Sequence, residues 1–362
     1  MNKTVLFYMN YAAPYPGNFI ASIRILIKKM EERGIDAHCI FPHTARCRHW
    51  VGDLVEEGVH VSFLPVEPAQ RLKLIKTILK EEHIIFVHMH FTDDIRERLI
   101  LKLAMFVTGK KCPIVVHYHN HYATHNGFIK QFIKKAVMHG DYLVGCGAGV
   151  AESIKAGNFK NDITFVDNAI DFSRLKSFRQ GSGKRNFLQF GFDFERKGVD
   201  LSLEAIEHLI PKYPDLTLSI CLASNMEYVR NKIIEKYGKI PDWVRLLPPV
   251  DDIAEYYDDA CAFLSPSREE GLCYSVIEAA YCRCPVIAAD ISGLNEIQIP
   301  EIIWCQSGDF RDLQKQIDSF LCLTEEEKCR LGERLKASAQ QNYDLKRWEQ
   351  QMITYYEKRG LL

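Results

Sequence analysis

The sequence predicts an α/β fold with two domains, each a parallel β-sheet covered by helices on both faces. Short runs of β-branched and aromatic residues alternate with amphipathic helical stretches along the whole chain. This alternation occurs in two series, which a polar stretch at residues 173–186 separates. The 362 residues are also more than one compact core usually holds. Two domains in sequence are therefore expected.

The first series contains six strand candidates, which begin the six strand–helix units of a complete Rossmann-like domain. The candidates are residues 4–9, 35–41, 59–64, 84–89, 113–119 and 141–146. Between them, amphipathic helices are predicted at residues 19–33, 71–82 and 129–139, and Gly34 and Gly140 follow the first and the last of these. An N-terminal domain is expected over residues 1–172.

The second series predicts another Rossmann-like domain, over residues 187–343. Its strand candidates are residues 187–192, 216–223, 243–249, 261–267, 285–290 and 301–305. A helical pattern follows the strands, as at residues 199–210. In the stretch from Ser173 to Asn186, Gly, Ser and cations replace the apolar period, so this stretch is predicted to be the hinge linker.

The last helix is predicted over residues 344–362, and it carries an apolar stripe. Trp348, Met352, Tyr355 and Tyr356 recur at i, i+4, i+7 and i+8. A stripe of this kind must be buried, and we expect it to pack back on the N-terminal domain.

Composition excludes several classes of protein. The 46 Lys and Arg balance 47 Asp and Glu, so the chain lacks the overall positive charge of a general nucleic-acid binder. The 12 cysteines are scattered without a CxxC pair, which indicates free thiols in a reducing cytoplasm. The apolar run at residues 4–9 ends without a signal-peptide exit and is interpreted as the first strand. No stretch reaches eighteen apolar residues, so no membrane-spanning helix is expected.

The segment from Phe263 to Glu278 is the most informative for chemistry. A strand ends in a polar loop, and Gly271 precedes a helical pattern. The free backbone N–H groups near Leu272 and Cys273 then favour a phosphate anion at the helix start. Glu270 would lie in the loop beside this anion, and Glu278 about a turn and a half into the helix. The two carboxylates suit sugar hydroxyls on either side of a phosphate, although a capping Glu and a solvated helix Glu would give the same pattern.

These residues carry a family resemblance. Residues 265–288, S-P-S-x-x-E-G-x-x-x-S-V-I-E-A-A-x-C-x-C-P-V-I-A, resemble the signature of family-4 glycosyltransferases of the GT-B fold, the retaining E-x7-E group. Residues 191–200 are similar to the phosphate-binding loop of that family, with Lys197 in the position of its Lys. Residues 166–171, 16–18 and 87–91 also resemble segments of the family, and residues 113–119 place His119 at its active-site His. The resemblance runs from about residue 14 to residue 300.

The resemblance implies a metal-independent enzyme that uses a nucleotide diphosphate sugar. It would transfer the sugar to a carbohydrate or lipid-linked glycan acceptor with retention of anomeric configuration, typically in polysaccharide biosynthesis. No D-x-D signature of a metal-dependent transferase is present, and neither a cofactor nor a nucleic-acid partner is expected. Two alternatives remain open: a GT-B sugar-nucleotide epimerase and a sugar-nucleotide-binding partner without catalysis.

The resemblance also assigns roles to particular residues. His119, Glu270 and Lys197 would be catalytic. Glu278 would contact the ribose and Glu270 the donor sugar, while Lys197 and Arg196 neutralise the diphosphate. The expected donor-binding set is Arg196, Lys197, Gly271, Leu272, Cys273 and Glu278. The expected acceptor-binding set is Gly17, Asn18, His88 and His90.

The chain departs from the family pattern at four positions. Phe192 stands where the family usually has Arg, so Arg196 would have to replace one phosphate-binding cation. Asn18 occupies the second glycine position of the early turn, Pro248 stands where Gly is common, and Arg283 replaces a small residue. These departures leave the predicted fold intact and weaken the assignment of the donor.

Two further patterns have competing interpretations. His117, His119, His121 and His125 could suggest a metal site, but no Cys or carboxylate lies nearby in sequence, so no metal site is predicted. Residues 71–80 and 128–137 are cationic and amphipathic. They could rest on the cytoplasmic face of an anionic membrane as a peripheral contact of the N-terminal domain, or simply pack on the sheet.

Overall fold

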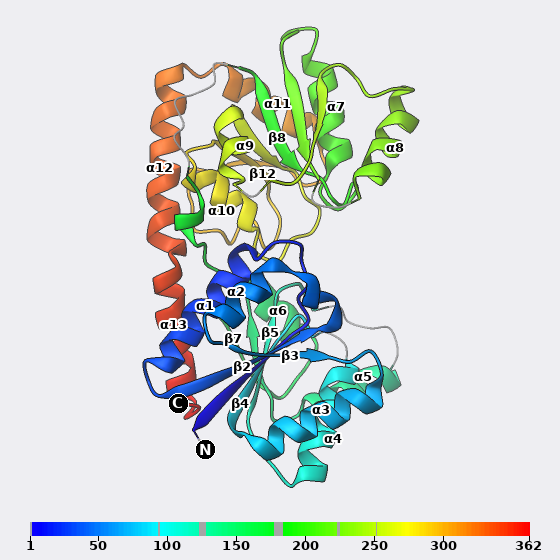
Figure 1. The fold of residues 1–362 in the computed structure, drawn as a ribbon. Coiled ribbons are helices and arrows are strands. Elements are labelled where there is room, and N and C mark those ends of the chain that lie inside the picture. Colours follow the sequence, from blue (N-terminus) through cyan, green and yellow to red (C-terminus); the bar gives the residue numbers. More distant parts are fainter. Residues whose placement is uncertain (1, 93–94, 123–127, 177–183, 223–224, 251) are drawn as a thin grey trace. The chain divides into compact units, whose positions relative to one another are not determined.

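The computed structural model of the chain describes residues 2–92, 95–122, 128–176, 184–222, 225–250 and 252–362. The chain divides into two compact units (Figure 1). Unit 1 comprises Met1–Ala169 together with Leu345–Leu362, and unit 2 comprises Ile170–Asp344. Each unit contains one sheet and its own covering helices, and each is described by itself.

The sheet of unit 1 has seven strands among the described residues, all parallel to their neighbours. The strands are β1 (Lys3–Met9), β2 (Ile35–Pro42), β3 (His60–Leu64), β4 (His83–His90), β5 (Ile114–Tyr118), β6 (Tyr142–Gly145) and β7 (Asp162–Phe165). Their order across the sheet is β3-β2-β1-β4-β5-β6-β7. The progression of strands across the sheet therefore reverses between β1 and β4. Open α/β sheets commonly bind ligands at such a point.

Helices connect these strands, as parallel pairing requires. They are α1 (Gly17–Glu31), α2 (His49–Glu56), α3 (Pro68–Glu81), α4 (Ile95–Thr108), α5 (Phe128–Met138), α6 (Ala148–Ala156) and the 3₁₀ helix η1 (His43–Cys47). Gly34 follows α1 with φ of +69°, and Gly140 follows α5 with φ of +81°. Both are left-handed conformations that end a helix readily only when the residue is glycine.

The last helix, α13 (Leu345–Lys358), belongs to unit 1. The stripe formed by Trp348, Met352 and Tyr356 is buried in the same core as Phe86 of β4. The Phe86 and Tyr356 ring centroids lie 4.9 Å apart. Arg359, beyond the end of α13, donates to Asp162 of β7 at 2.7 Å. The C-terminal segment thus completes the hydrophobic core of unit 1.

The sheet of unit 2 has six parallel strands among the described residues. They are β8 (Asn186–Phe190), β9 (Thr217–Cys221), β10 (Val244–Leu247), β11 (Ala262–Ser265), β12 (Val286–Ala289) and β13 (Ile303–Cys305). Their order is β10-β9-β8-β11-β12-β13, so the progression of strands across the sheet reverses between β8 and β11. Its helices are α7 (Val199–Leu209), α8 (Met226–Tyr237), α9 (Ala254–Asp259), α10 (Tyr274–Tyr281), α11 (Phe310–Leu321), α12 (Glu325–Tyr343) and the 3₁₀ helix η2 (Phe172–Arg174).

The predicted fold class is confirmed, since both halves are parallel α/β sheets of the Rossmann-like type. All twelve predicted strand segments contain a strand, and β7 is the one that the sequence analysis missed. Its four residues, DITF, form no buried apolar run because β7 is an edge strand with largely exposed or half-buried side chains. Within the predicted linker at 173–186, residues 177–183 lie outside the described part of the chain, and the division between the units falls earlier, after Ala169.

Candidate functional site

Two loops at the carboxyl ends of β8 and β11 form the candidate site in unit 2. Gly191 directly follows β8, and a Cβ atom there would lie 2.5 Å from Ile220 Cγ2, so only glycine fits. Gly198 ends the first loop with φ of +66°, and a Cβ atom there would lie 2.1 Å from the carbonyl oxygen of Pro266 in the second loop. The two loops are further joined by the amide of Arg268, which donates to the carbonyl of Arg196 at 2.8 Å. Their backbones therefore hold each other in place.

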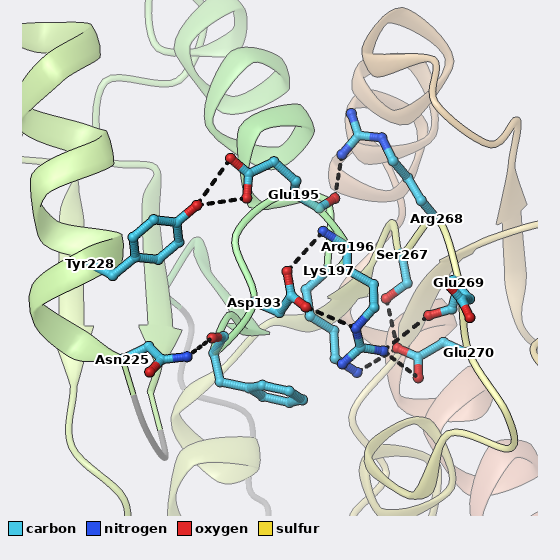
Figure 2. Close-up of polar contacts among 11 residues, drawn as sticks. Asp193, Glu195, Arg196, Lys197, Asn225, Tyr228, Ser267, Arg268, Glu269 and Glu270 are labelled. Carbon is cyan, nitrogen blue, oxygen red and sulfur yellow. Dashed lines mark hydrogen bonds and ion pairs between the residues drawn. The ribbon is translucent and has the colours of Figure 1, made fainter. Parts of the chain in front are cut away.

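A buried ion pair lies where these loops meet. The Lys197 ammonium donates to Glu270 Oε1, and the Lys197 and Glu270 side chains are only 10% and 8% exposed. Ser267 Oγ donates to the same carboxylate oxygen at 2.9 Å. Arg196 Nη1 lies 3.8 Å from Glu270 Oε2 (Figure 2). One carboxylate thus faces two cations and one hydroxyl, all from residues that follow β8 or β11.

Arg196 is held by groups other than Glu270. Its Nε donates to Asp193 Oδ2 at 3.1 Å, and its Nη1 donates to the Glu269 carbonyl at 3.2 Å. The ring of Phe192 lies 5.3 Å from the guanidinium carbon of Arg196 and 5.0 Å from the Lys197 ammonium. Phe192 therefore contacts both cations at cation–π distance, at the position where the resemblance leads one to expect an Arg.

A second set of polar contacts stabilises the first loop from outside. The guanidinium of Arg268 binds both Asp200 oxygens, at 2.8 and 2.7 Å, and it also donates to the Glu195 carbonyl. The Tyr228 hydroxyl of α8 donates to the Glu195 carboxylate at 2.9 Å. Asn225 Nδ2 donates to the Phe192 carbonyl at 3.1 Å (Figure 2). This set could not be predicted from the sequence, because the contacts join residues 33 to 73 positions apart.

Glu278 lies in α10, one turn after the helix begins, and its side chain is buried. The hydroxyl of Tyr257 lies 3.4 Å from Glu278 Oε2 and donates to the Ser275 carbonyl at 3.0 Å. Burial and then the nearby Glu278 charge raise the pKa of Tyr257 well above its usual value, so this hydroxyl remains a hydrogen-bond donor. Both carboxylates of the E-x7-E pattern are therefore buried and hydrogen-bonded rather than solvated.

The backbone between the two carboxylates is tightly constrained. Leu272 and Cys273 are buried, and Cys273 directly precedes α10. In the part of the chain that the structure describes, neither of their backbone N–H groups is paired with a carbonyl. Gly293 packs closely against the backbone of this loop, since a Cβ atom at Gly293 would lie 2.2 Å from the Gly271 carbonyl oxygen. The free amides thus lie at a helix start, as anion binding requires.

The candidate residues of unit 1 lie at the carboxyl ends of β1, β4 and β5. Gly17 begins α1 with φ of +57°, and Asn18 is buried in its first turn. His119 directly follows β5; its ring stacks on Phe91 at 4.1 Å and meets Phe19 edge-on at 5.6 Å. Phe91 has φ of +54°, a left-handed conformation that is strained for an aromatic residue and often marks a functional position.

His88 and His90 are fully buried, and this placement argues against direct contact with an acceptor. Nδ1 of His88 bonds the Tyr356 hydroxyl at 2.7 Å, and Nδ1 of His90 bonds His119 Nε2 at 3.1 Å. Burial lowers the pKa of His88, His90, His117 and His119 well below the usual range, so all four rings are neutral at pH 7. His125 lies outside the described residues.

Comparisons with known proteins identify similarity to glycosyltransferases. Residues 174–339 match the family model described as "Glycosyl transferases group 1". Two curated relatives are an uncharacterized glycosyltransferase of Haemophilus influenzae, 30% identical over 137 residues, and one component of the human phosphatidylinositol N-acetylglucosaminyltransferase, 33% identical over 115 residues. These matches cover 37% and 31% of this chain but only 38% and 23% of the two relatives.

Among solved structures, the fold is similar to that of Anabaena Alr3699/HepE in complex with UDP-glucose. The TM-score is 0.76 at 16% identity, and the match covers 99% of this chain and 100% of the other. At this identity the likeness shows the fold alone. Residues 174–339 of this chain therefore resemble the group 1 glycosyl transferases, and the chain as a whole has the GT-B fold.

Proposed function

We propose that the chain transfers a sugar from a nucleotide diphosphate sugar to a carbohydrate or lipid-linked glycan acceptor. The observation that carries this proposal is the buried pair of Lys197 and Glu270, with the half-buried Arg196 beside it, next to the free amides of Leu272 and Cys273. Two cations and a helix start suit a diphosphate, and a carboxylate beside them suits the hydroxyls of a sugar. A structural neighbour binds UDP-glucose, which supports this class of donor.

In the proposed mechanism, Lys197 and Arg196 stabilise the negative charge that develops on the leaving diphosphate. Such stabilisation lowers the barrier because the charge is larger in the transition state than in the bound donor. Glu270 would then exchange its bond to Lys197 for donor-sugar hydroxyls, while Ser267 and Arg196 keep the carboxylate in position. The two cations can neutralise a diphosphate without a metal ion, so we propose a metal-independent reaction.

Glu278 would accept hydrogen bonds from the ribose, with Tyr257 fixing the orientation of its carboxylate. His119 is the proposed catalytic residue of unit 1, and its neutral ring can accept or donate one hydrogen bond to the reacting sugar. Gly17 and Asn18, at the start of α1, would contact the acceptor. By its resemblance to the E-x7-E group, the transfer would retain the anomeric configuration.

Two helices of unit 1 carry large apolar side chains that are exposed. Phe106 of α4 and Phe132 of α5 are 84% and 66% exposed. Leu99, Leu103, Val107 and Ile133 on the same two helices are also exposed, and Lys110 and Lys111 follow α4. No helix among the described residues combines the length and the hydrophobicity needed to cross a bilayer. We propose that this apolar and cationic face rests on an anionic membrane surface.

The experiment that tests the function is a panel of UDP, GDP and ADP and their sugars, with binding followed by thermal shift and calorimetry. A true donor at 100 times its Kd adds about 2.7 kcal/mol to the free energy of unfolding. Slow release of nucleotide diphosphate without acceptor would indicate an enzyme, whereas binding without release would favour the non-catalytic partner that Phe192 leaves open. Release of an epimerised sugar would favour the epimerase. No binding of any panel member would contradict the proposal.

Metal independence, retention of configuration and membrane contact each need a separate measurement. Turnover that persists in EDTA supports metal independence, and NMR of the first-formed product distinguishes retention from inversion. Sedimentation with vesicles of anionic and of neutral lipid tests the membrane face, with Phe106→Asp as the variant. Equal sedimentation of the wild type with both kinds of vesicle would contradict the electrostatic part of the proposal.

A further inference from the structure

Three buried histidines lie together on one face of the unit 1 sheet. His88, His90 and His117 are 0%, 1% and 1% exposed. His90 of β4 pairs in register with His117 of β5, and His88 pairs with Val115 two residues earlier on each strand. Because side chains two apart in a strand point to the same side, the three rings share one face. This arrangement results from pairing two strands, so no run of residues in the sequence displays it.

The ring nitrogens of this group are close together and mostly unpaired. One nitrogen from each of the three rings lies within 4.8 Å of the other two. Nδ1 of His88 bonds Tyr356 and Nδ1 of His90 bonds His119. Among the described residues, Nε2 of His88, Nε2 of His90 and both nitrogens of His117 have no hydrogen-bond partner. A buried polar atom without a partner costs about 1–3 kcal/mol, so a group of four calls for an explanation.

The pattern of these bonds is the one that metal-binding histidines show. A metal-ligating imidazole usually binds the ion through one nitrogen, while a neighbouring group holds the other nitrogen and fixes the ring. Tyr356 and His119 hold the Nδ1 atoms of His88 and His90 in this way, and both rings keep Nε2 free.

We propose that His88, His90 and His117 form a binding site for one divalent transition-metal ion such as Zn²⁺. Three imidazoles suit zinc and its neighbours in the first transition row better than Mg²⁺ or Ca²⁺, which prefer oxygen ligands. A tetrahedral ion at about 2.0–2.1 Å from each nitrogen would draw the nitrogens to about 3.3 Å from one another. The rings therefore turn inward when the ion binds, and the fourth position takes a ligand from solvent.

The ion would have a structural role. The ring of His88 is held by Tyr356 of α13, and His90 and His117 come from adjacent strands. The metal would therefore join β4 to β5 and fasten the C-terminal helix to the sheet of unit 1. This inference does not depend on the proposed donor-binding residues of unit 2. It shares one residue with the proposed reaction, because His119 also bonds His90.

A second cluster of potential ligands in unit 1 provides a matched control. His38, His60 and Glu82 also lie close together. However, both ring nitrogens of His38 are already bonded, to Glu82 at 2.7 Å and to Ser62 at 2.9 Å, and the His60 side chain is 63% exposed. This second cluster is explained by its own hydrogen bonds.

The test uses the full chain without an affinity tag, stripped by a chelator and then titrated with Co²⁺ and with Zn²⁺. We expect one Zn²⁺ per chain by elemental analysis and, with Co²⁺, the visible absorption of a tetrahedral complex. His117→Asn should lose both signals, while His60→Asn should keep them. Tyr356→Phe keeps all three ligands and removes only the hydroxyl that orients His88, so metal affinity should fall about 10–100-fold.

Three results would overturn the inference. The first is a folded wild-type chain that takes up no ion. The second is loss of the Co²⁺ absorption in His60→Asn with retention in His117→Asn. The third is unchanged affinity in Tyr356→Phe, which also decides the question if His117→Asn fails to fold.

Discussion

The two units share one topology and place different chemistry at the same point of it. In unit 1 the progression of strands across the sheet reverses between β1 and β4, and in unit 2 it reverses between β8 and β11. At the end of β4 stand His88 and His90, whereas β11 is followed by Ser267 and Glu270. The fold decides where a site can form, and the residues after the strand decide what it can bind.

The buried polar side chains of the two units are also compensated in different ways. In unit 2 the charges of Lys197 and Glu270 compensate one another, and Ser267 supplies a further hydrogen bond. In unit 1 all members are neutral rings, and several of their nitrogens have no partner among the described residues. A charge pair can open to accept a charged ligand, while a set of neutral lone pairs suits a cation. Four substitutions in unit 2 test this difference, in order of decreasing effect.

Lys197→Ala should have the largest effect. It removes the cation that stabilises the leaving diphosphate and leaves Glu270 with less compensation, so turnover should fall about 10²–10³-fold. The measurement is nucleotide diphosphate release from the donor identified in the panel. Lys239→Ala, at a side chain that is 74% exposed, should leave turnover unchanged. Similar turnover in both variants would remove Lys197 from the proposed site.

Gly198→Ala should destabilise unit 2 by more than about 2 kcal/mol. The left-handed φ of +66° alone costs an alanine about 1–2 kcal/mol, and the new Cβ atom would also lie 2.1 Å from the Pro266 carbonyl oxygen. Gly238→Ala is the matched control, because φ there is +76° and no atom lies within 4 Å of the added Cβ. Chemical denaturation gives the free energies of unfolding. Equal losses in the two variants would mean that the loops do not depend on their close approach.

Glu278→Gln should weaken nucleotide binding about tenfold and change the stability of the unliganded chain little. The amide keeps the shape of the side chain but loses the charge that accepts the ribose hydroxyls, and hydrogen bonds to charged groups contribute about 1.5–3 kcal/mol. Calorimetric titration with the nucleotide diphosphate measures the change. Glu235→Gln in α8, at a side chain that is 76% exposed, serves as the control. An unchanged Kd in Glu278→Gln would exclude the ribose contact.

Phe192→Leu should have the smallest effect. It removes two cation–π contacts worth about 0.5–1 kcal/mol each at a partly exposed site, which loosens Arg196 and Lys197. Donor affinity should therefore fall about two- to fivefold. Phe310→Leu removes a ring that contacts Arg311 elsewhere in unit 2 and should not affect the donor. A rise in affinity on Phe192→Leu would show that the ring obstructs the site.

Much of the fold could be predicted from local sequence. Buried parallel strands are continuous apolar runs, so all but one of the described strands were predictable from the sequence pattern alone. The edge strand β7 was not predictable in this way. Its sequence, DITF, has no apolar pattern, and the strand forms by pairing with β6. The burial of α13 was also foreseeable, since its stripe of Trp348, Met352 and Tyr356 could not remain in water.

The candidate site was predictable only in part. Glu270, Glu278 and Lys197 were chosen because they belong to short motifs, and the roles assigned to them remain predictions. The support from Arg268, Tyr228 and Asn225 left no local pattern, because each of these residues contacts a loop that is distant in sequence. The histidines of one strand were not predicted to bind a metal, because no Cys or carboxylate lies near them in sequence. Strand pairing, which sets His117 beside His90, is not visible in the sequence.

The amino-acid sequence was sufficient to predict two parallel sheets, all their described strands except β7, and the motifs that follow strands β8 and β11. These features depend on periodicity and on residues close in the chain, which the sequence displays directly. Which polar groups are paired in the protein interior, and which have no partner among the described residues, becomes visible only in the folded chain. Pairing depends on distances between residues far apart in sequence, and these distances exist only once the chain has folded.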